Sequence, residues 1–195
     1  MTDTTAALTP APTQHNWLWV DLETTGLDPR ALSARILEVA LVLANDGMTG
    51  DLTPMHDFST VVGATAEDVA HIDPYVRTMH TKNGLLSECA ASTVTIGEVD
   101  DVLLEIAREV TGAERPRGLV LAGFSVHFDL DWIRVHLPKF AGCLSHRVFD
   151  VSVLKAAGRA WLPGYDPAKG EAHRALADVR ESLRAAAEWR QAVGL

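Results

Sequence analysis

The chain has 195 residues, the size of one ordinary domain with a single core. Its hydrophobic residues, 47% of the total, are evenly spread, and no apolar run approaches the roughly 20 residues that a membrane span needs. The net charge of −9 argues against a protein that coats long duplex DNA, because phosphate binding needs a positive surface. We therefore expect a soluble, cytoplasmic protein that does not bind membranes, although the charge alone indicates only solubility.

The N-terminal part of the sequence predicts a leader segment followed by three strands. Residues 1–14 are rich in Thr, Ala and Pro without periodicity, which predicts a flexible leader before one domain over residues 15–195. The β-rich runs at 17–23, 35–45 and 58–62 are separated by turn residues. They predict a three-stranded antiparallel meander.

The rest of the chain alternates helices and strands. Residues 66–92 are irregular and predict short helices and loops. A capping box of Thr95 and Glu98 starts an amphipathic helix. The elements expected after it are a strand at 118–123, a helix at 128–137, a strand at 147–150, a helix at 151–161 and a long last helix. This order predicts an α/β fold, a mixed sheet flanked by helices.

Asp21 and Glu23 are the most informative residues, because they end the first predicted strand. Side chains two apart on a strand project from the same face, so the two carboxylates lie side by side. Such a pair is tolerated if solvent screens it or if a divalent cation bridges it, and Mg²⁺ or Mn²⁺ favours oxygen ligands. For these two residues alone, a solvated strand end is the more common explanation.

Three further residues give weaker signals. Asp129 opens the helix after the strand at 118–123, where Asp is also a common N-cap. His173 and Asp178 are five residues apart, and on one regular helix they would point about 140° apart. They can converge only if the last helix begins after His173. A surface Asp and a capping or surface His are the ordinary explanations.

Taken together, these residues have a specific form, and the chain resembles the DEDDh 3′-to-5′ exonucleases. Within that superfamily it is similar to the oligoribonucleases. The likeness is carried by VDLETTGLDP at 20–29, RILEVA at 35–40, MHTKNGLL at 79–86, FDVSVLK at 149–155 and HRALADVRES at 173–182. It spans nearly all of the predicted domain in the family's order.

The resemblance implies a ribonuclease-H-like exonuclease fold and a two-metal phosphodiester hydrolase. Asp21, Glu23, Asp129 and Asp178 would bind two divalent cations, Mg²⁺ or Mn²⁺, and His173 would be the general base. A neutral imidazole near pH 7 suits proton removal from water. The implied substrate is short single-stranded RNA or DNA, which is cut to 5′-mononucleotides. The resemblance allows a homodimer but does not require one.

The resemblance also implies a set of substrate-binding residues. Leu27 would wedge against a base, although covering the core is an equal alternative. Tyr75 stands where the family has a stacking Trp. His80 aligns with a histidine that contacts phosphate, although a surface histidine is nearly as common an explanation. The implied set is Thr24, Thr25, Gly26, Leu27, Tyr75, His80, Ser125 and Phe128.

Besides Tyr75, three further positions depart from the oligoribonuclease pattern. Phe124 and Phe128 replace an Asn and a Gln, so GFSVHFD is closer to the corresponding segment of proofreading-type exonucleases. His146 replaces a Tyr that caps very short substrates in oligoribonuclease dimers. A proofreading- or repair-type exonuclease acting on longer single strands therefore remains an alternative.

Two other classes of protein fit these residues less well. A non-catalytic module that binds nucleic-acid ends would not need all five candidate catalytic residues. A zinc hydrolase is disfavoured because neither HExxH nor CxxC is present, and no P-loop sequence occurs.

Overall fold

The computed structural model describes residues 17–44, 54–165 and 173–194. The predicted leader, residues 1–14, lies outside this range. The described strands are β1 (Trp17–Thr24), β2 (Ile36–Ala44), β3 (Pro54–Val61), β4 (Leu119–Gly123) and β5 (Leu144–Asp150). The helices are α1 (Pro74–Lys82), α2 (Leu85–Ala91), α3 (Ile96–Thr111), α4 (His127–His136), α5 (Pro138–Ala141), α6 (Val151–Trp161) and α7 (Ala175–Ala192).

The described strands form one mixed sheet in the order β3-β2-β1-β4-β5. β2 is antiparallel to both β1 and β3, which confirms the predicted meander, and β4 and β5 add to β1 in parallel. The mixed sheet flanked by helices confirms the predicted fold class.

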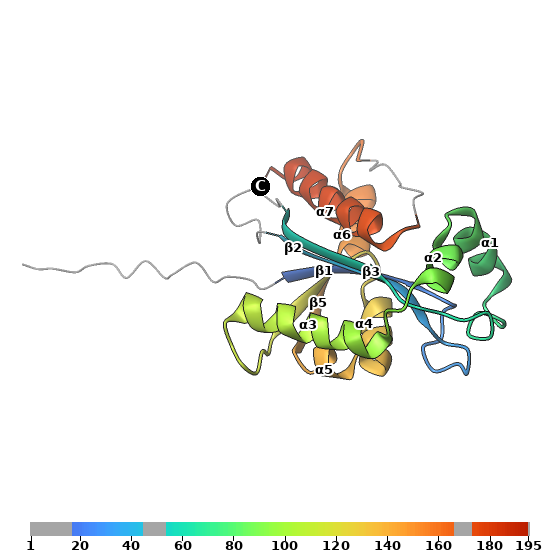
Figure 1. Ribbon diagram of the computed structural model, residues 1–195. Helices are drawn as coiled ribbons and strands as arrows, with labels where there is room; N and C mark the ends of the chain where they lie inside the picture. The colour runs from blue at the N-terminus through green and yellow to red at the C-terminus, as the bar shows by residue number, and fades with distance from the viewer. Residues whose placement is uncertain (1–16, 45–53, 166–172, 195) are drawn as a thin grey trace, which may run out of the picture.

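Helices cover both faces of the sheet, as Figure 1 shows: α3, α4 and α5 lie on one face, and α6 and α7 on the other. Side chains alternate along β1, so Leu18 and Val20 join the core cluster beneath α3 and α4, while Trp19 joins the one beneath α7. The pair α1 and α2 packs beside one end of β2 around Leu37 and Leu85. Among the described residues, none of the helices is long and apolar enough to cross a membrane.

Most predicted boundaries hold within a few residues. The capping box of Thr95 and Glu98 is present at the start of α3. β3 and β5 begin earlier than predicted, at Pro54 and Leu144. Pro138 does end α4, but it also opens the short helix α5, because proline is well accommodated at a first helical position.

Candidate active site

Three carboxylates meet at the carboxyl end of β1. Asp21 and Glu23 project from the face of the sheet that α7 covers, and Asp178 comes from the first turn of α7. One carboxylate oxygen from each of these residues lies within 4.8 Å of the others. The fold thus brings together two predicted ligands from the first strand and one from the last helix.

Asp129 lies against the same strand end. The ladder between β1 and β4 reaches only as far as the pairing of Trp19 with Ala122, so the N–H of Leu22 lies beyond it. The buried Asp129 carboxylate accepts a hydrogen bond from this N–H at 3.0 Å. Val126, not Asp129, occupies the N-cap position of α4, so capping does not explain this aspartate.

Gly123 allows the chain to turn from β4 into α4. A Cβ atom at this position would lie 2.7 Å from the carbonyl oxygen of Val20. Glycine is therefore required by the close approach of two backbones, and this approach brings Asp129 next to β1.

The carboxylates destabilise one another's ionised forms. Burial, followed by the charges of Asp129 and Glu23, raises the pKa of Asp21 well above its usual value. Burial, then the charges of Asp178 and Glu38, raises the pKa of Glu23 to about 8. Burial also raises the pKa of Asp129 and of Asp178. A bound cation would relieve this repulsion and displace the protons.

The donor set fits a hard divalent cation. It consists of carboxylate oxygens, which are the ligands that Mg²⁺ and Mn²⁺ prefer. In the part of the chain that the structure describes, no other set of three Asp, Glu, His or Cys residues shares this spacing. No Cys and His cluster of the zinc type is found there, and Cys89 and Cys143 are buried free thiols.

Glu38 is a further buried carboxylate at this site, and sequence reasoning gave it no role. It lies directly opposite Glu23 across the β1–β2 ladder. Both of its oxygens are engaged: Arg174 donates Nε to Oε2 and Nη2 to Oε1, each at 3.0 Å, and the N–H of Ala175 donates to Oε2 at 3.0 Å. Glu38 is therefore neutralised by Arg174, whereas Glu23 has the ring of His80 beside it, with Nε2 3.6 Å from Oε2.

His173 lies just before α7, which begins at Ala175. This satisfies the condition that the helix must begin after His173 for the histidine and Asp178 to converge. The His173 side chain is exposed, and its backbone has φ 45°. Burial raises the pKa of Asp178, and the charge of His173 opposes that rise.

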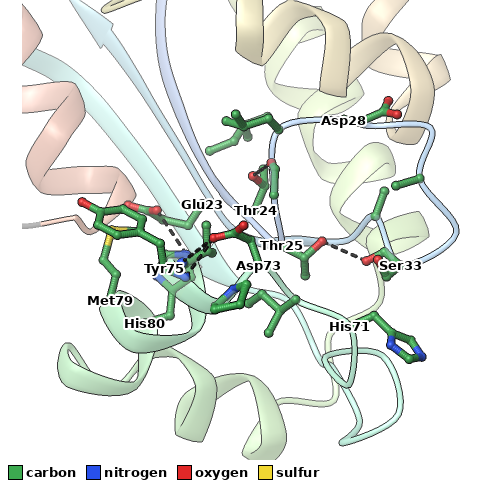
Figure 2. A pocket seen from close by; sticks show the side chains of 18 of the residues that line it. Glu23, Thr24, Thr25, Asp28, Ser33, His71, Asp73, Tyr75, Met79 and His80 are labelled. Atoms are coloured by element: carbon green, nitrogen blue, oxygen red, sulfur yellow. Dashed lines mark hydrogen bonds and ion pairs between the residues drawn. The ribbon is translucent and has the colours of Figure 1, made fainter.

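A pocket of about 890 Å³ opens beside Glu23 (Figure 2). One wall is the segment that follows β1, and the other is formed by α1 with the residues leading into it. The figure shows Tyr75, Met79 and His80 gathered beside Glu23, with Asp28 and Ser33 farther along the pocket. The predicted substrate-binding residues that line it are Thr24, Thr25, Gly26, Leu27, Tyr75, His80 and Phe128.

The large hydrophobic residues of the pocket lining that are exposed are Leu27 and Tyr75. Leu27 is 83% exposed, so the alternative in which it covers the core is wrong. Tyr75 is 74% exposed near the start of α1, a helix that Asp73 caps by accepting hydrogen bonds from two backbone N–H groups. Both apolar surfaces are available to a ligand.

Among the implied substrate-binding residues, His80 is buried and Ser125 lies outside the pocket. His80 is fully buried, and its Nε2 lies 3.6 Å from Oε2 of Glu23, so it lies behind the carboxylate and not on the surface. Ser125 is outside the pocket lining, and its N–H donates to Asp150 at 3.0 Å and to Ser152 at 2.9 Å. A contact between either residue and substrate stays a prediction.

The chain has close relatives among the oligoribonucleases. It is 38% identical to an oligoribonuclease of Corynebacterium diphtheriae, covering 93% of this chain and 84% of that one. It is 35% identical to an oligoribonuclease of a Mycobacterium species, with coverage of 89% and 79%. For an oligoribonuclease of Arabidopsis thaliana the identity is 33%, with coverage of 86% and 73%.

Solved structures share the fold at low identity. An exonuclease I from Methylocaldum szegediense superposes with a TM-score of 0.68 at 19% identity, covering 90% of this chain. Exonuclease I of E. coli in complex with a dT13 oligonucleotide gives 0.65 at 14% identity, covering 89%. The chain spans about 40% of the length of these two proteins.

The model of the RNase T exonuclease family matches residues 18–186, a range that runs from the second residue of β1 into α7 and includes all four predicted carboxylate ligands. Since this match spans most of the chain and the oligoribonuclease relatives exceed 30% identity over most of their own length, the chain belongs to the RNase T family of exonucleases.

Proposed function

We propose that this protein is a 3′-to-5′ exoribonuclease that degrades short single-stranded oligonucleotides to 5′-mononucleotides. The observation that carries the proposal is the convergence of Asp21, Glu23 and Asp178 beside an open pocket. The relatives named as oligoribonucleases support the choice of substrate class.

The proposed cofactor is a pair of divalent cations, Mg²⁺ or Mn²⁺, held by Asp21, Glu23, Asp129 and Asp178. Bound cations of this kind activate water as a nucleophile and stabilise charge on the reacting phosphate and its leaving oxygen. The raised pKa values of Asp21 and Glu23 support this assignment, because carboxylates that repel one another gain most from a cation.

His173 is the proposed general base. Its side chain is exposed just before α7, and Asp178 is in the first turn of that helix, so the imidazole could take a proton from the attacking water and pass it to bulk solvent. The scissile phosphate would then lie between His173 and the three carboxylates at the end of β1, with the 3′-terminal nucleotide in the pocket. Leu27 and Tyr75 would contact its base, and the segment 24–27 would lie against its 3′ end.

A proofreading- or repair-type exonuclease on longer single strands is the second candidate, and one observation favours it. Phe128 lines the pocket, where the oligoribonuclease pattern has a polar residue. Phe124 packs against the core cluster beneath α7, and Nζ of Lys155 lies 4.6 Å from the centre of its ring. The pocket is thus more apolar than the family pattern implies. A non-catalytic module that only binds nucleic-acid ends would leave the three carboxylates at the end of β1 without a role.

We extend the proposal to a cytoplasmic homodimer. β5 is the last strand at one edge of the described sheet, and α6, which follows it directly, exposes Val153 and Trp161. Exposed apolar side chains of this size often mark protein interfaces. Sedimentation of the full chain tests this, because Trp161→Ala should weaken a dimer, while a monomeric parent protein would exclude it.

The decisive experiment is a Mn²⁺-dependent time course on a mixture of 5′-labelled RNA dinucleotide, RNA heptamer and DNA heptamer. Products are resolved by length. Consumption of the dinucleotide well ahead of both heptamers supports an oligoribonuclease. Ladders from the heptamers with a spared dinucleotide favour the second candidate, and binding without any cleavage would leave the non-catalytic module.

A further inference from the structure

His173 has a backbone conformation that its surroundings must maintain. Its φ of 45° is in the left-handed region, which non-glycine residues adopt uncommonly and at some cost in free energy. Ser125 is the other non-glycine residue with positive φ among those described. An exposed side chain has few packing contacts of its own, so the backbone on either side has to fix the direction of the His173 ring.

Asn83 makes the first of these backbone contacts. This residue ends α1, and its Nδ2 donates a hydrogen bond to the carbonyl oxygen of His173 at 2.6 Å, across 90 residues of sequence. Its Oδ1 accepts from the N–H of Leu85 at 3.1 Å. Both halves of the amide are therefore used, which fixes the amide in the orientation that points its N–H group toward His173.

Arg174 makes the second contact, immediately after His173. Its guanidinium binds the buried Glu38 of β2 through two nitrogens and Glu88 of α2 at 3.0 and 2.7 Å. Paired N–H donors of this kind fix direction as well as distance. Together with the hydrogen bond from Ala175 to Glu38, they attach the start of α7 to β2 and α2.

We propose that Asn83 and Arg174 are positioning residues that hold His173 in its strained conformation. They would thereby aim its imidazole at the three carboxylates at the end of β1. This inference rests on the proposed function, in which His173 is the general base. Neither residue touches the reacting atoms, so both act through His173. The same contacts link the base to α1, which forms part of one wall of the pocket, and to α2, which Figure 1 shows beside the start of α7.

The sharpest variant is Asn83→Asp. It keeps Oδ1 as the acceptor for Leu85 but replaces the N–H donor with an oxygen that repels the His173 carbonyl. We expect kcat on a 5′-labelled RNA oligonucleotide with Mn²⁺ to fall by about 10- to 100-fold, since small misplacements of a catalytic group have effects of this order. KM and Mn²⁺ affinity should stay within about twofold of the parent values, because the pocket and the carboxylates are unchanged.

A double-mutant cycle separates positioning from a general loss of structure. In a His173→Ala background, Asn83→Asp should have no further effect on kcat, because its target side chain is gone. Arg174→Lys should behave in the same way with a smaller loss. The matched control is Arg180→Lys on the same helix, whose side chain binds Asp57 on β3, and it should leave kcat unchanged.

The inference is overturned if Asn83→Asp retains the parent kcat, or if it lowers kcat by the same factor with and without His173. If thermal unfolding shows that Asn83→Asp does not fold, Arg174→Lys carries the same cycle. Failure of the proposed function looks different: the parent protein itself would then not cleave the RNA oligonucleotide. If the parent cleaves it and His173→Ala alone keeps the parent rate, His173 is not the base and there is nothing for Asn83 to position.

Discussion

Asp21, Glu23 and Asp178 project from regular elements that pack into the core, whereas Leu27 and Tyr75 project from a loop and from the first turn of a short helix. The first set is held together despite mutual repulsion, and the second is mostly exposed. The difference suggests that the sheet and α7 determine the chemistry, while the pocket wall determines which nucleotide chain is accepted. Changes to the carboxylates should therefore affect turnover, and changes to the wall should affect binding.

The largest effect is expected for Asp129→Asn. The amide oxygen can still accept the hydrogen bond from Leu22, so the fold should persist, but the charge that would bind a cation is lost. Loss of several kcal/mol of transition-state stabilisation corresponds to a fall in kcat on the order of 10³-fold or more. Steady-state kinetics with Mn²⁺ measures it, and Asp131→Asn, exposed on the same helix, is the matched control. Retained activity in Asp129→Asn would remove Asp129 from the site.

His173→Ala should have the next largest effect. Loss of a general base slows the chemical step by about 10²- to 10⁴-fold. Metal affinity should be largely retained, because the carboxylates stay in place. Activity and Mn²⁺ titration calorimetry are measured on the same preparation. If affinity collapsed and excess Mn²⁺ restored the rate, His173 would be a ligand and not a base.

Local rules predict only part of the carboxylate site. Alternation along a strand puts Asp21 and Glu23 on one face, but their role as ligands, and the need for His173 to meet Asp178, came from the resemblance to the DEDDh exonucleases. The mixed sheet follows from the order of the elements. Strand alternation and element order depend on short stretches of chain, so a single sequence can predict them.

The supporting contacts could not be predicted in this way. Asn83 and His173 are 90 residues apart, and Glu38 and Arg174 are 136 apart, so only the tertiary fold brings them together. One signal was present: Glu38 is the single charged residue in the apolar run ILEVALVLA. A carboxylate in a buried strand needs a partner, and that requirement alone could have prompted a search for an arginine.

A binding effect should follow from changes to Tyr75. Removing a base-stacking ring costs about 1 to 3 kcal/mol per base, so Tyr75→Ala should raise KM about tenfold with little change in kcat. Tyr75→Trp should keep or lower KM. Because Tyr75 is 74% exposed, thermal stability should hardly change. Val102→Ala, exposed on α3 outside the pocket, serves as the control. An unchanged KM in Tyr75→Ala would exclude stacking.

The last prediction concerns the stability of the metal-free protein and not its activity. The pKa of Glu23 is raised from 4.5 to about 8, chiefly by burial, so between these values the folded protein holds a proton that the unfolded chain has lost. This contribution to stability is complete below pH 4.5 and is lost as pH rises through 8. In EDTA, Tm of the parent protein should therefore fall relative to that of Glu23→Gln between pH 5 and 8.5. The expected fall is about 2 to 4 °C for each kcal/mol lost from the free energy of unfolding.

Mn²⁺ sharpens this last measurement. A cation that binds only the folded state raises Tm, and it should do so more at pH 8 than at pH 5, where protons compete for the carboxylates. Glu109→Gln, which changes an exposed residue of α3, should keep the behaviour of the parent protein. If Tm of the parent protein and of Glu23→Gln changed in parallel with pH, the repulsion at the end of β1 would be relieved by something other than protons. The contrast between carboxylates that repel one another and an open pocket wall would then no longer explain how the site works.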